Sequence, residues 1–220
     1  MRRKAVIFGT SGFAECVDFL LQRDSEYEVV GFTATTDGIS ASTAFGRPLV
    51  PFEAVTELFP CDEHDMFVAV AYRQLNRLRE RLCGQARAKG YRLLSYLSSK
   101  ATHWGDMVIG DNVFIFEDNT LQPFVTIGDG TILWSGNHIG HHSRVGSCCF
   151  ITSHVVLSGY CRVGDRCFLG VNATIAENTS IADDNLIGPG TLIQKDTHPR
   201  DVYVANRTEK FPKDSTRFFR

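Results

Sequence analysis

Three of the seven histidines lie close together in the stretch from Asn137 to Ser143. They are His138, His141 and His142. An imidazole titrates near neutral pH, so it can take a proton from an attacking nucleophile. Acyl transfer from a thioester to an amine or a hydroxyl needs this proton transfer, a donor that stabilises the carbonyl oxygen, and alignment of both substrates. The cluster is therefore the strongest candidate for acid–base chemistry in the chain.

A second candidate site follows the apolar run over residues 5–8, at the turn Gly9-Thr10-Ser11-Gly12. A glycine-rich turn between a strand and a helix lets backbone N–H groups and the helix N-terminus face an anionic ligand. No glycine occupies position 14, so the full dinucleotide fingerprint is absent and the turn does not select a nucleotide. A structural turn without a ligand is the alternative interpretation.

A strict sixfold repeat indicates the element that positions the histidines. Every sixth residue is aliphatic, in the series Ile109, Ile115, Leu121, Ile127, Leu133, Ile139, Val145, Ile151, Leu157, Val163, Leu169, Ile175, Ile181, Ile187 and Ile193. A period of six fits neither an α-helix nor a flat strand, and it is typical of a parallel β-helix. Residues two positions earlier share the strand face and are mostly small, and glycine recurs one position later. At three hexads a coil, the series predicts about five coils.

The hexad register predicts which side chains face outward. Ile139 points into the prism, so His138 points out and His141 lies at the next corner. Asn119 and Asn137 occupy inward slots one coil apart, which predicts a buried ladder of stacked amides.

Residues 1–100 predict a different architecture, with apolar runs that alternate with amphipathic stretches. We expect strands over 5–8, 27–32, 66–71 and 91–97, and helices over 13–22, 51–59 and 75–89. Alternating strands and helices favour a small parallel sheet of Rossmann type. The predicted organisation is a domain over 1–100, a β-helix over 101–198 and a tail over 199–220.

Composition and charge limit the classes of function. The chain has 220 residues and a formal net charge of −2, which argues against a general surface for nucleic acid or anionic membrane. No apolar run approaches the roughly 20 residues that span a bilayer, and the basic N-terminus leads straight into the first strand, as in a cytoplasmic protein. The seven cysteines lack metal-type spacing, and their odd number argues against a disulfide framework.

The unbroken hexapeptide repeats resemble those of the left-handed β-helix acyltransferases. With a small Rossmann-like domain before them, they resemble the sialic-acid O-acetyltransferase family of sugar O-acyltransferases, and are similar to bacterial N-acetyltransferases of nucleotide-linked amino sugars. The resemblance covers essentially the whole chain, and the left-handed sense comes from it alone. It implies a homotrimer with active sites between subunits, acetyl-CoA between neighbouring prisms, a nucleotide-linked sugar on the N-terminal domain, and no metal.

The same resemblance implies roles for individual residues. Matching through the segment 167–172 puts the catalytic base of the family on His141, with His142 where the family has an orienting acidic residue; His138 is a further candidate. Contacts to coenzyme are implied at Gly159, Gly170, Asn172, Gly188 and Lys195, with a backbone N–H near Gly159 as the oxyanion donor. Contacts to the nucleotide sugar are implied at Gly9, Thr10, Ser11, Gly12, Asp37, Tyr72 and Arg73.

These expectations combine into an acetyl-CoA-dependent N-acetyltransferase for a nucleotide-linked amino sugar in surface-polysaccharide biosynthesis, with direct transfer and His141 as general base. Two alternatives stay open, a sugar O-acetyltransferase of the sialic-acid type and a β-helix scaffold without catalytic activity. A zinc carbonic anhydrase on the same prism is disfavoured, because His138 and His142 fall in different hexad slots. The sequence specifies neither the nucleotide nor the sugar.

Overall fold

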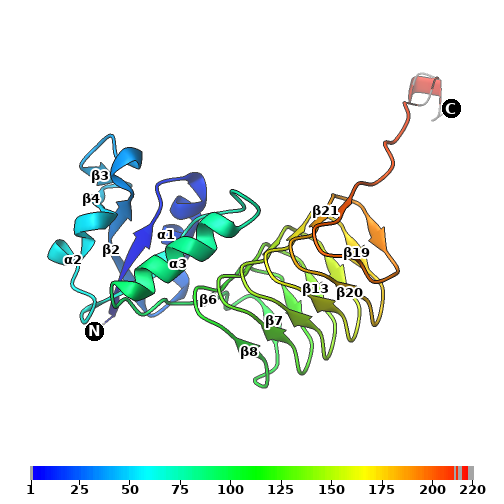
Figure 1. Cartoon of the computed structure of the whole chain (residues 1–220), viewed down its shortest axis with the longest axis horizontal. Helices are drawn as coiled ribbons and strands as arrows, with labels where there is room; N and C mark the ends of the chain where they lie inside the picture. The colour runs from blue at the N-terminus through cyan, green and yellow to red at the C-terminus, as the bar shows by residue number, and fades with distance from the viewer. Residues whose placement is uncertain (1, 211, 213–214, 218–220) are drawn as a thin grey trace.

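A computed structural model describes residues 2–210, 212 and 215–217, and its N-terminal part is built on one five-stranded sheet (Figure 1). The strand order is β3-β4-β2-β1-β5, with β3 antiparallel to β4 and the other pairs parallel. The strands are β1 (Arg3–Phe8), β2 (Tyr27–Ala34), β3 (Thr43–Ala44), β4 (Arg47–Pro51) and β5 (His64–Val68). The helices are α1 (Gly12–Asp24), α2 (Val55–Leu58) and α3 (Arg77–Ala88), with short 3-10 helices at η1 (Thr36–Gly38), η2 (Phe52–Ala54) and η3 (Ser215–Arg217).

The alternation of side chains along β1 decides which helix covers which face of this sheet. Ala5 and Ile7 are buried in a cluster with Val17 of α1, whereas Val6 and Phe8 belong to a second cluster with side chains of α2 and α3. Successive strand residues point to opposite faces, so a short apolar run is buried on both sides. Helices thus cover both faces, as the alternation in the sequence predicted.

Further along, the chain winds into a triangular prism with a parallel sheet on each of three faces (Figure 1). Face 1 contains β6 (Tyr96–Leu97), β9 (Phe114–Ile115), β12 (Ile132–Leu133), β15 (Phe150–Ile151), β18 (Phe168–Leu169), β21 (Leu186–Ile187) and β23 (Val202–Tyr203). Face 2 contains β7 (Thr102–His103), β10 (Thr120–Leu121), β13 (His138–Ile139), β16 (Val156–Leu157), β19 (Thr174–Ile175) and β22 (Leu192–Ile193). Face 3 contains β8 (Val108–Ile109), β11 (Thr126–Ile127), β14 (Arg144–Val145), β17 (Arg162–Val163) and β20 (Ser180–Ile181). This is the predicted left-handed β-helix.

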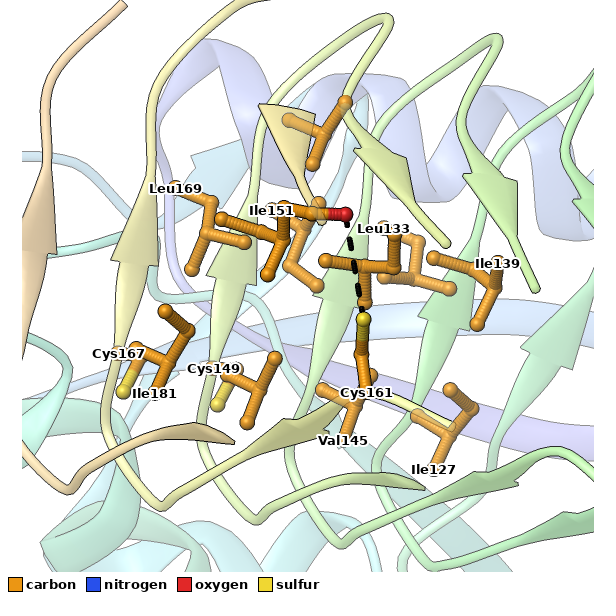
Figure 2. Close-up of a cluster of buried hydrophobic side chains, with 14 of the residues drawn as sticks. Ile127, Leu133, Ile139, Val145, Cys149, Ile151, Cys161, Cys167, Leu169 and Ile181 are labelled. Carbon is orange, nitrogen blue, oxygen red and sulfur yellow. Dashed lines mark hydrogen bonds between the residues drawn. The ribbon is translucent and has the colours of Figure 1, made fainter. Parts of the chain in front are cut away.

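The hexad slots fill the prism as the repeat predicted. From β8 to β22, the second residue of each strand belongs to the core of the prism, and Figure 2 shows several of these aliphatic side chains stacked with Cys149, Cys161 and Cys167. The predicted amide ladder is confirmed, because Asn137 Nδ2 donates to Asn119 Oδ1 at 3.0 Å. The chain passes from face 1 to face 2 at corner 1/2, from face 2 to face 3 at corner 2/3, and from face 3 back to face 1 at corner 3/1.

The prediction of a single strand over 91–97 was wrong. Met66 N–H donates to the Arg92 carbonyl and Leu94 N–H to the Met66 carbonyl, so residues 92–94 lie along the edge of β5. The following residues form β6, which pairs with β9 of the prism. One apolar run therefore serves two sheets, and periodicity alone does not show where the chain passes from one to the other.

The paired strands of the prism extend past 101–198 at both ends. Strand β6 precedes this range, and β23, inside the predicted tail, pairs with β21. Residues 211, 213–214 and 218–220 of that tail lie outside the described part of the chain. Within the described part, no helix is both long and apolar enough to cross a membrane.

The N-terminal part packs on the outer side of face 1. Phe13 of α1 meets Phe114 at a ring-centroid distance of 6.0 Å, and Phe116 stacks on Trp134 at 4.5 Å within the same cluster. Beyond them, the ring centroids of Tyr72 and Phe150 lie 5.0 Å apart. Face 1 is thus the covered face of the prism, and corner 2/3 is the edge opposite to it.

A buried arginine joins the two parts at corner 3/1. Arg79 of α3 is completely buried, and no carboxylate among the described residues pairs with it. Burial lowers the pKa of its guanidinium. Its nitrogens donate at 2.5–3.0 Å to the backbone carbonyls of Val70, Ala71, Gly130, Cys148 and Cys149, and at 3.1 Å to Asn76 Oδ1. The guanidinium thereby connects the loop after β5 to two coils of the prism.

Candidate functional site

Two of the three clustered histidines meet at corner 2/3, between β13 and β14. His141 Nδ1 lies 3.2 Å from His142 Nδ1, within hydrogen-bond distance. The corner backbone is held by the coil before it, since His141 N–H donates to Gln122 Oε1 at 2.9 Å and His142 N–H to the Pro123 carbonyl at 3.1 Å. The His141 side chain is half-buried and that of His142 is exposed. A half-exposed imidazole with a fixed neighbour can accept a proton from a substrate.

The ring of His141 lies against Gly159, one coil further along the same corner. A Cβ atom at position 159 would come within 2.8 Å of His141 Cε1 and 2.9 Å of Nε2, closer than real contacts allow. Tyr160 packs its ring across the His141 ring at 5.0 Å and 88°. The absence of a side chain at Gly159 therefore leaves the space that the His141 ring occupies.

The backbone of Gly159 offers a donor beside this imidazole. Its carbonyl accepts a hydrogen bond from Asn178 N–H at 2.9 Å, whereas its N–H donates to no group in the described part of the chain. A free backbone N–H next to a base is the arrangement that stabilises a developing oxyanion in acyl transfer.

His138 lies apart from this pair, on the outer side of face 2. It belongs to β13, where it pairs in register with Thr120 and Val156, and it is half-buried. The structure thus brings His141 and His142 together and leaves His138 on the adjoining face.

Among the described residues, no carboxylate forms an ion pair with His141 or with His142, which stands where the family has an orienting acidic residue. The one histidine with a carboxylate ion pair among the described residues is His198, with Asp201. His142 therefore occupies the position next to His141 without a carboxylate behind it. Within the described residues, no three His, Cys, Asp or Glu side chains gather in a way that could hold a metal ion.

The five residues expected to contact coenzyme border face 2 from both sides. Gly159 and the exposed Lys195 lie on corner 2/3, whereas Gly170, Asn172 and Gly188 lie on corner 1/2. Gly170 and Gly188 are buried, and their N–H groups already donate to the next coil, to the carbonyls of Ile187 and Tyr203. Close stacking of the coils accounts for glycine at both positions, because a Cβ would lie 2.4 Å from Pro189 N and 2.8 Å from Tyr203 O, respectively.

The N-terminal part holds a cleft of about 310 Å³ at the carboxyl ends of β1 and β5. Gly9, Thr10, Ser11 and Arg73 line it, which brings together four of the seven residues expected to contact a nucleotide sugar. Gly12 and Asp37 are exposed outside this lining, and Tyr72 packs on face 1 of the prism. A cleft at the carboxyl ends of parallel strands is the usual ligand site of such sheets.

A larger hollow of about 740 Å³ adjoins this cleft and shares Thr35, Leu78 and Leu82 with it. Arg81 and Lys89 of the α3 region line it and were not among the predicted site residues. The basic amphipathic pattern over 75–89 was the signal that could have indicated them.

Comparison with known proteins agrees with this two-part architecture. Residues 106–140 match the family described as bacterial transferase hexapeptide (six repeats). No curated protein matches the chain.

Two solved structures match almost the whole chain. The acetyltransferase domain of PglB from Neisseria gonorrhoeae FA1090, in complex with acetyl coenzyme A, is 21% identical with a TM-score of 0.81, over 92% of this chain and 96% of that one. PerB from Caulobacter crescentus, in complex with CoA and GDP-perosamine, is 26% identical with a TM-score of 0.81, over 90% of this chain and 92% of that one. The chain therefore carries a bacterial transferase hexapeptide segment and has the two-part fold of the hexapeptide-repeat sugar acetyltransferases.

Proposed function

We propose that this protein transfers the acetyl group of acetyl-CoA to the amino group of a nucleotide-linked sugar, in the cytoplasm, as a step of surface-polysaccharide biosynthesis. The observation that carries the proposal is the match, over 90% of the chain, to an N-acetyltransferase bound to CoA and GDP-perosamine. That share is larger than either the N-terminal part or the prism alone, so the match extends over both.

In the proposed reaction, His141 Nε2 accepts the proton that the acceptor amine loses as it attacks the thioester carbonyl. The N–H of Gly159, adjacent to the same imidazole, donates to the carbonyl oxygen as negative charge develops on it. The bond from carbon to sulfur then breaks, and the leaving thiolate takes up a proton. His141 thus holds the proton in transit, and the glycine backbone stabilises the charge.

The coenzyme is proposed to lie along face 2. Val156 and Leu192 point outward there with 37% and 59% of their surfaces exposed, which suits the apolar stretches of a pantetheine arm. Asn172 on corner 1/2 and Lys195 on corner 2/3 would add polar contacts, Lys195 to a phosphate. The buried Gly170 and Gly188 support the shape of the corner and offer no free N–H.

The positions of the two sites support a homotrimer with active sites between subunits. The nucleotide cleft belongs to the part that covers face 1, whereas His141 lies on corner 2/3, opposite to that face. Acceptor sugar bound in the cleft of one subunit would reach His141 of a neighbour, as closed cyclic assemblies allow.

The test is thiol release from acetyl-CoA across UDP-, dTDP- and GDP-linked 3- and 4-amino sugars and free sialic acid, with wild type, His141→Ala and His103→Ala side by side. His103 is exposed at the first coil of face 2 and serves as the matched control. We expect turnover with one amino sugar, a loss of about 10²–10⁴-fold in His141→Ala, and no change in the control.

Other outcomes would redirect the assignment. Turnover only with hydroxyl acceptors would indicate a sugar O-acetyltransferase. Full activity in His141→Ala would remove the base assignment and keep the enzyme. No turnover, with no heat of acetyl-CoA binding by calorimetry, would leave the scaffold interpretation.

A further inference from the structure

Corner 2/3 carries a column of aromatic rings beside the proposed base. Phe124, His142 and Tyr160 occupy the same slot of three successive coils. The His142 ring lies 4.6 Å from the Phe124 ring and 4.8 Å from the Tyr160 ring, and it is nearly parallel to the latter at 18°. His142 is therefore held between two rings, although its side chain is exposed.

The backbone of this column is in the left-handed region, which bulky residues such as Phe124 and Tyr160 rarely adopt. The φ angles are 66° at Phe124, 59° at His142 and 59° at Tyr160. Elsewhere the same left-handed slot holds mostly glycine, asparagine or aspartate, which tolerate it: Asn112, Asp118, Asn172 and Asp184 at the other corners, and Asn178 in the next coil of corner 2/3. Cys148, His154 and Arg166 are the exceptions at the other corners.

Burial of the Phe124 and Tyr160 side chains does not offset the cost of this backbone conformation. Phe124 is 57% exposed and Tyr160 is 48% exposed. Strained backbone that persists at an exposed position is a feature of functional sites. The column thus requires an explanation other than core packing.

His142 connects this column to the proposed base, because its imidazole lies within hydrogen-bond distance of the His141 ring. A bond between His141 Nδ1 and His142 Nδ1 contains one proton, so one of the two nitrogens donates and the other accepts. If His141 Nδ1 carries the proton, His141 Nε2 is left with a free lone pair and can act as a base. If His142 Nδ1 carries it, the neutral His141 is protonated at Nε2 and cannot accept a proton there.

We propose that His142, held between Phe124 and Tyr160, is the positioning residue that accepts a hydrogen bond from the Nδ1–H of His141 and so keeps Nε2 unprotonated for the acceptor amine. The inference rests on the proposed function of His141 and assigns the orienting group for it. Tyr160 contacts both imidazoles, because its ring is nearly parallel to that of His142 and perpendicular to that of His141. A neutral imidazole thus does the orienting that a carboxylate would otherwise do.

The first test reads the tautomer directly, without substrate. Nitrogen NMR of histidine-labelled protein distinguishes an imidazole protonated at Nδ1 from one protonated at Nε2. We expect neutral His141 to be protonated at Nδ1 in the wild type and mainly at Nε2 in His142→Phe, which keeps a stacked ring and removes the acceptor. A wild-type His141 protonated at Nε2 would overturn the proposal, whatever the enzyme acts on.

The second test separates kcat from KM. We expect His142→Phe to lower kcat about 10- to 100-fold, as when the orienting partner of a functional histidine is lost, with KM for both substrates unchanged. His142→Asn suits the left-handed backbone and supplies an amide oxygen as acceptor, so it should recover most of that loss. Tyr160→Leu, which removes the parallel ring, should give an intermediate kcat.

His103→Phe, the same substitution at an exposed site of face 2, is the control and should match the wild type. Unfolding midpoints of all variants show whether each one folds. A His142→Phe variant with wild-type kcat, beside an inactive His141→Ala, would reject the positioning role and keep the proposed function. Activity in both variants would reject the base assignment itself.

Discussion

Replacement of Arg79 by lysine tests how firmly the N-terminal part is joined to the prism. The guanidinium is completely buried and serves five backbone carbonyls together with an amide oxygen. A lysine keeps the charge but brings three donors on one nitrogen. The Cys149 carbonyl also accepts from Ile132 N–H, and the other five acceptors have no second donor among the described residues, so at least two of the five lose their partner. A buried polar group without a partner costs about 1–3 kcal/mol, and two of them cost about 2–6 kcal/mol.

The assay is thermal unfolding of Arg79→Lys at a fixed protein concentration, since association with other subunits also shifts the midpoint. For a chain of this size, about 1 kcal/mol corresponds to roughly 2–4 °C, so the midpoint should fall by at least about 4 °C. Arg81→Lys, the same substitution on the exposed side of α3, should stay within about 2 °C of the wild type. A shift of less than about 2 °C in Arg79→Lys would refute the reasoning, because it would mean that loss of the guanidinium hydrogen bonds does not destabilise the folded protein.

Two further changes test the histidine corner and the buried thiols. Gly159→Ala should lower kcat about 10- to 100-fold with the fold intact, because the added Cβ would lie 2.8 Å from His141 Cε1 and displace the ring. Gly84→Ala is the control, since a Cβ there meets nothing within 4 Å. Equal kcat in the two variants would contradict the steric argument. Iodoacetamide at pH 8 should label the exposed Cys16 first and spare Cys83 in the folded protein, because burial raises the pKa of the Cys83 thiol to about 12 and leaves about one thiolate in 10⁴. Peptide mass spectrometry over time measures the order, and early modification of Cys83 would be inconsistent with its burial.

The prism was predictable because its repeat is local. Each hexad places one aliphatic side chain inside and turns at a corner, so the inward position of Ile139 was enough to predict the outward face of His138 and the corner position of His141. Each coil repeats the same arrangement, and no knowledge of distant contacts is needed.

The connection between the two parts was not predictable in the same way. The helix over 75–89 was recognised as basic and amphipathic, and helical spacing puts Arg79 on the same face as Leu82, Cys83 and Ala86. The pattern does not show which groups would pair with a buried guanidinium. Its burial depends on carbonyls at Gly130 and Cys148, which are 51 and 69 residues away along the chain. The clamp on His142 likewise depends on neighbours 18 residues away on either side, and became visible only with the backbone in place.

The proposed homotrimer with active sites between subunits leads to a last prediction, which mixed trimers can test. Arg73→Glu alters only the cleft and His141→Ala only the corner, and each should be inactive alone. If cleft and corner of one chain formed the site together, every site in a mixed trimer would carry a lesion and activity would stay absent. If each site joins the cleft of one subunit to the corner of the next, equal mixing leaves about one site in four with both parts intact. Recovery of about a quarter of wild-type activity after co-expression, but not after simple mixing of preformed trimers, would therefore assign the site to the interface, and no recovery at all would argue for a site within one chain.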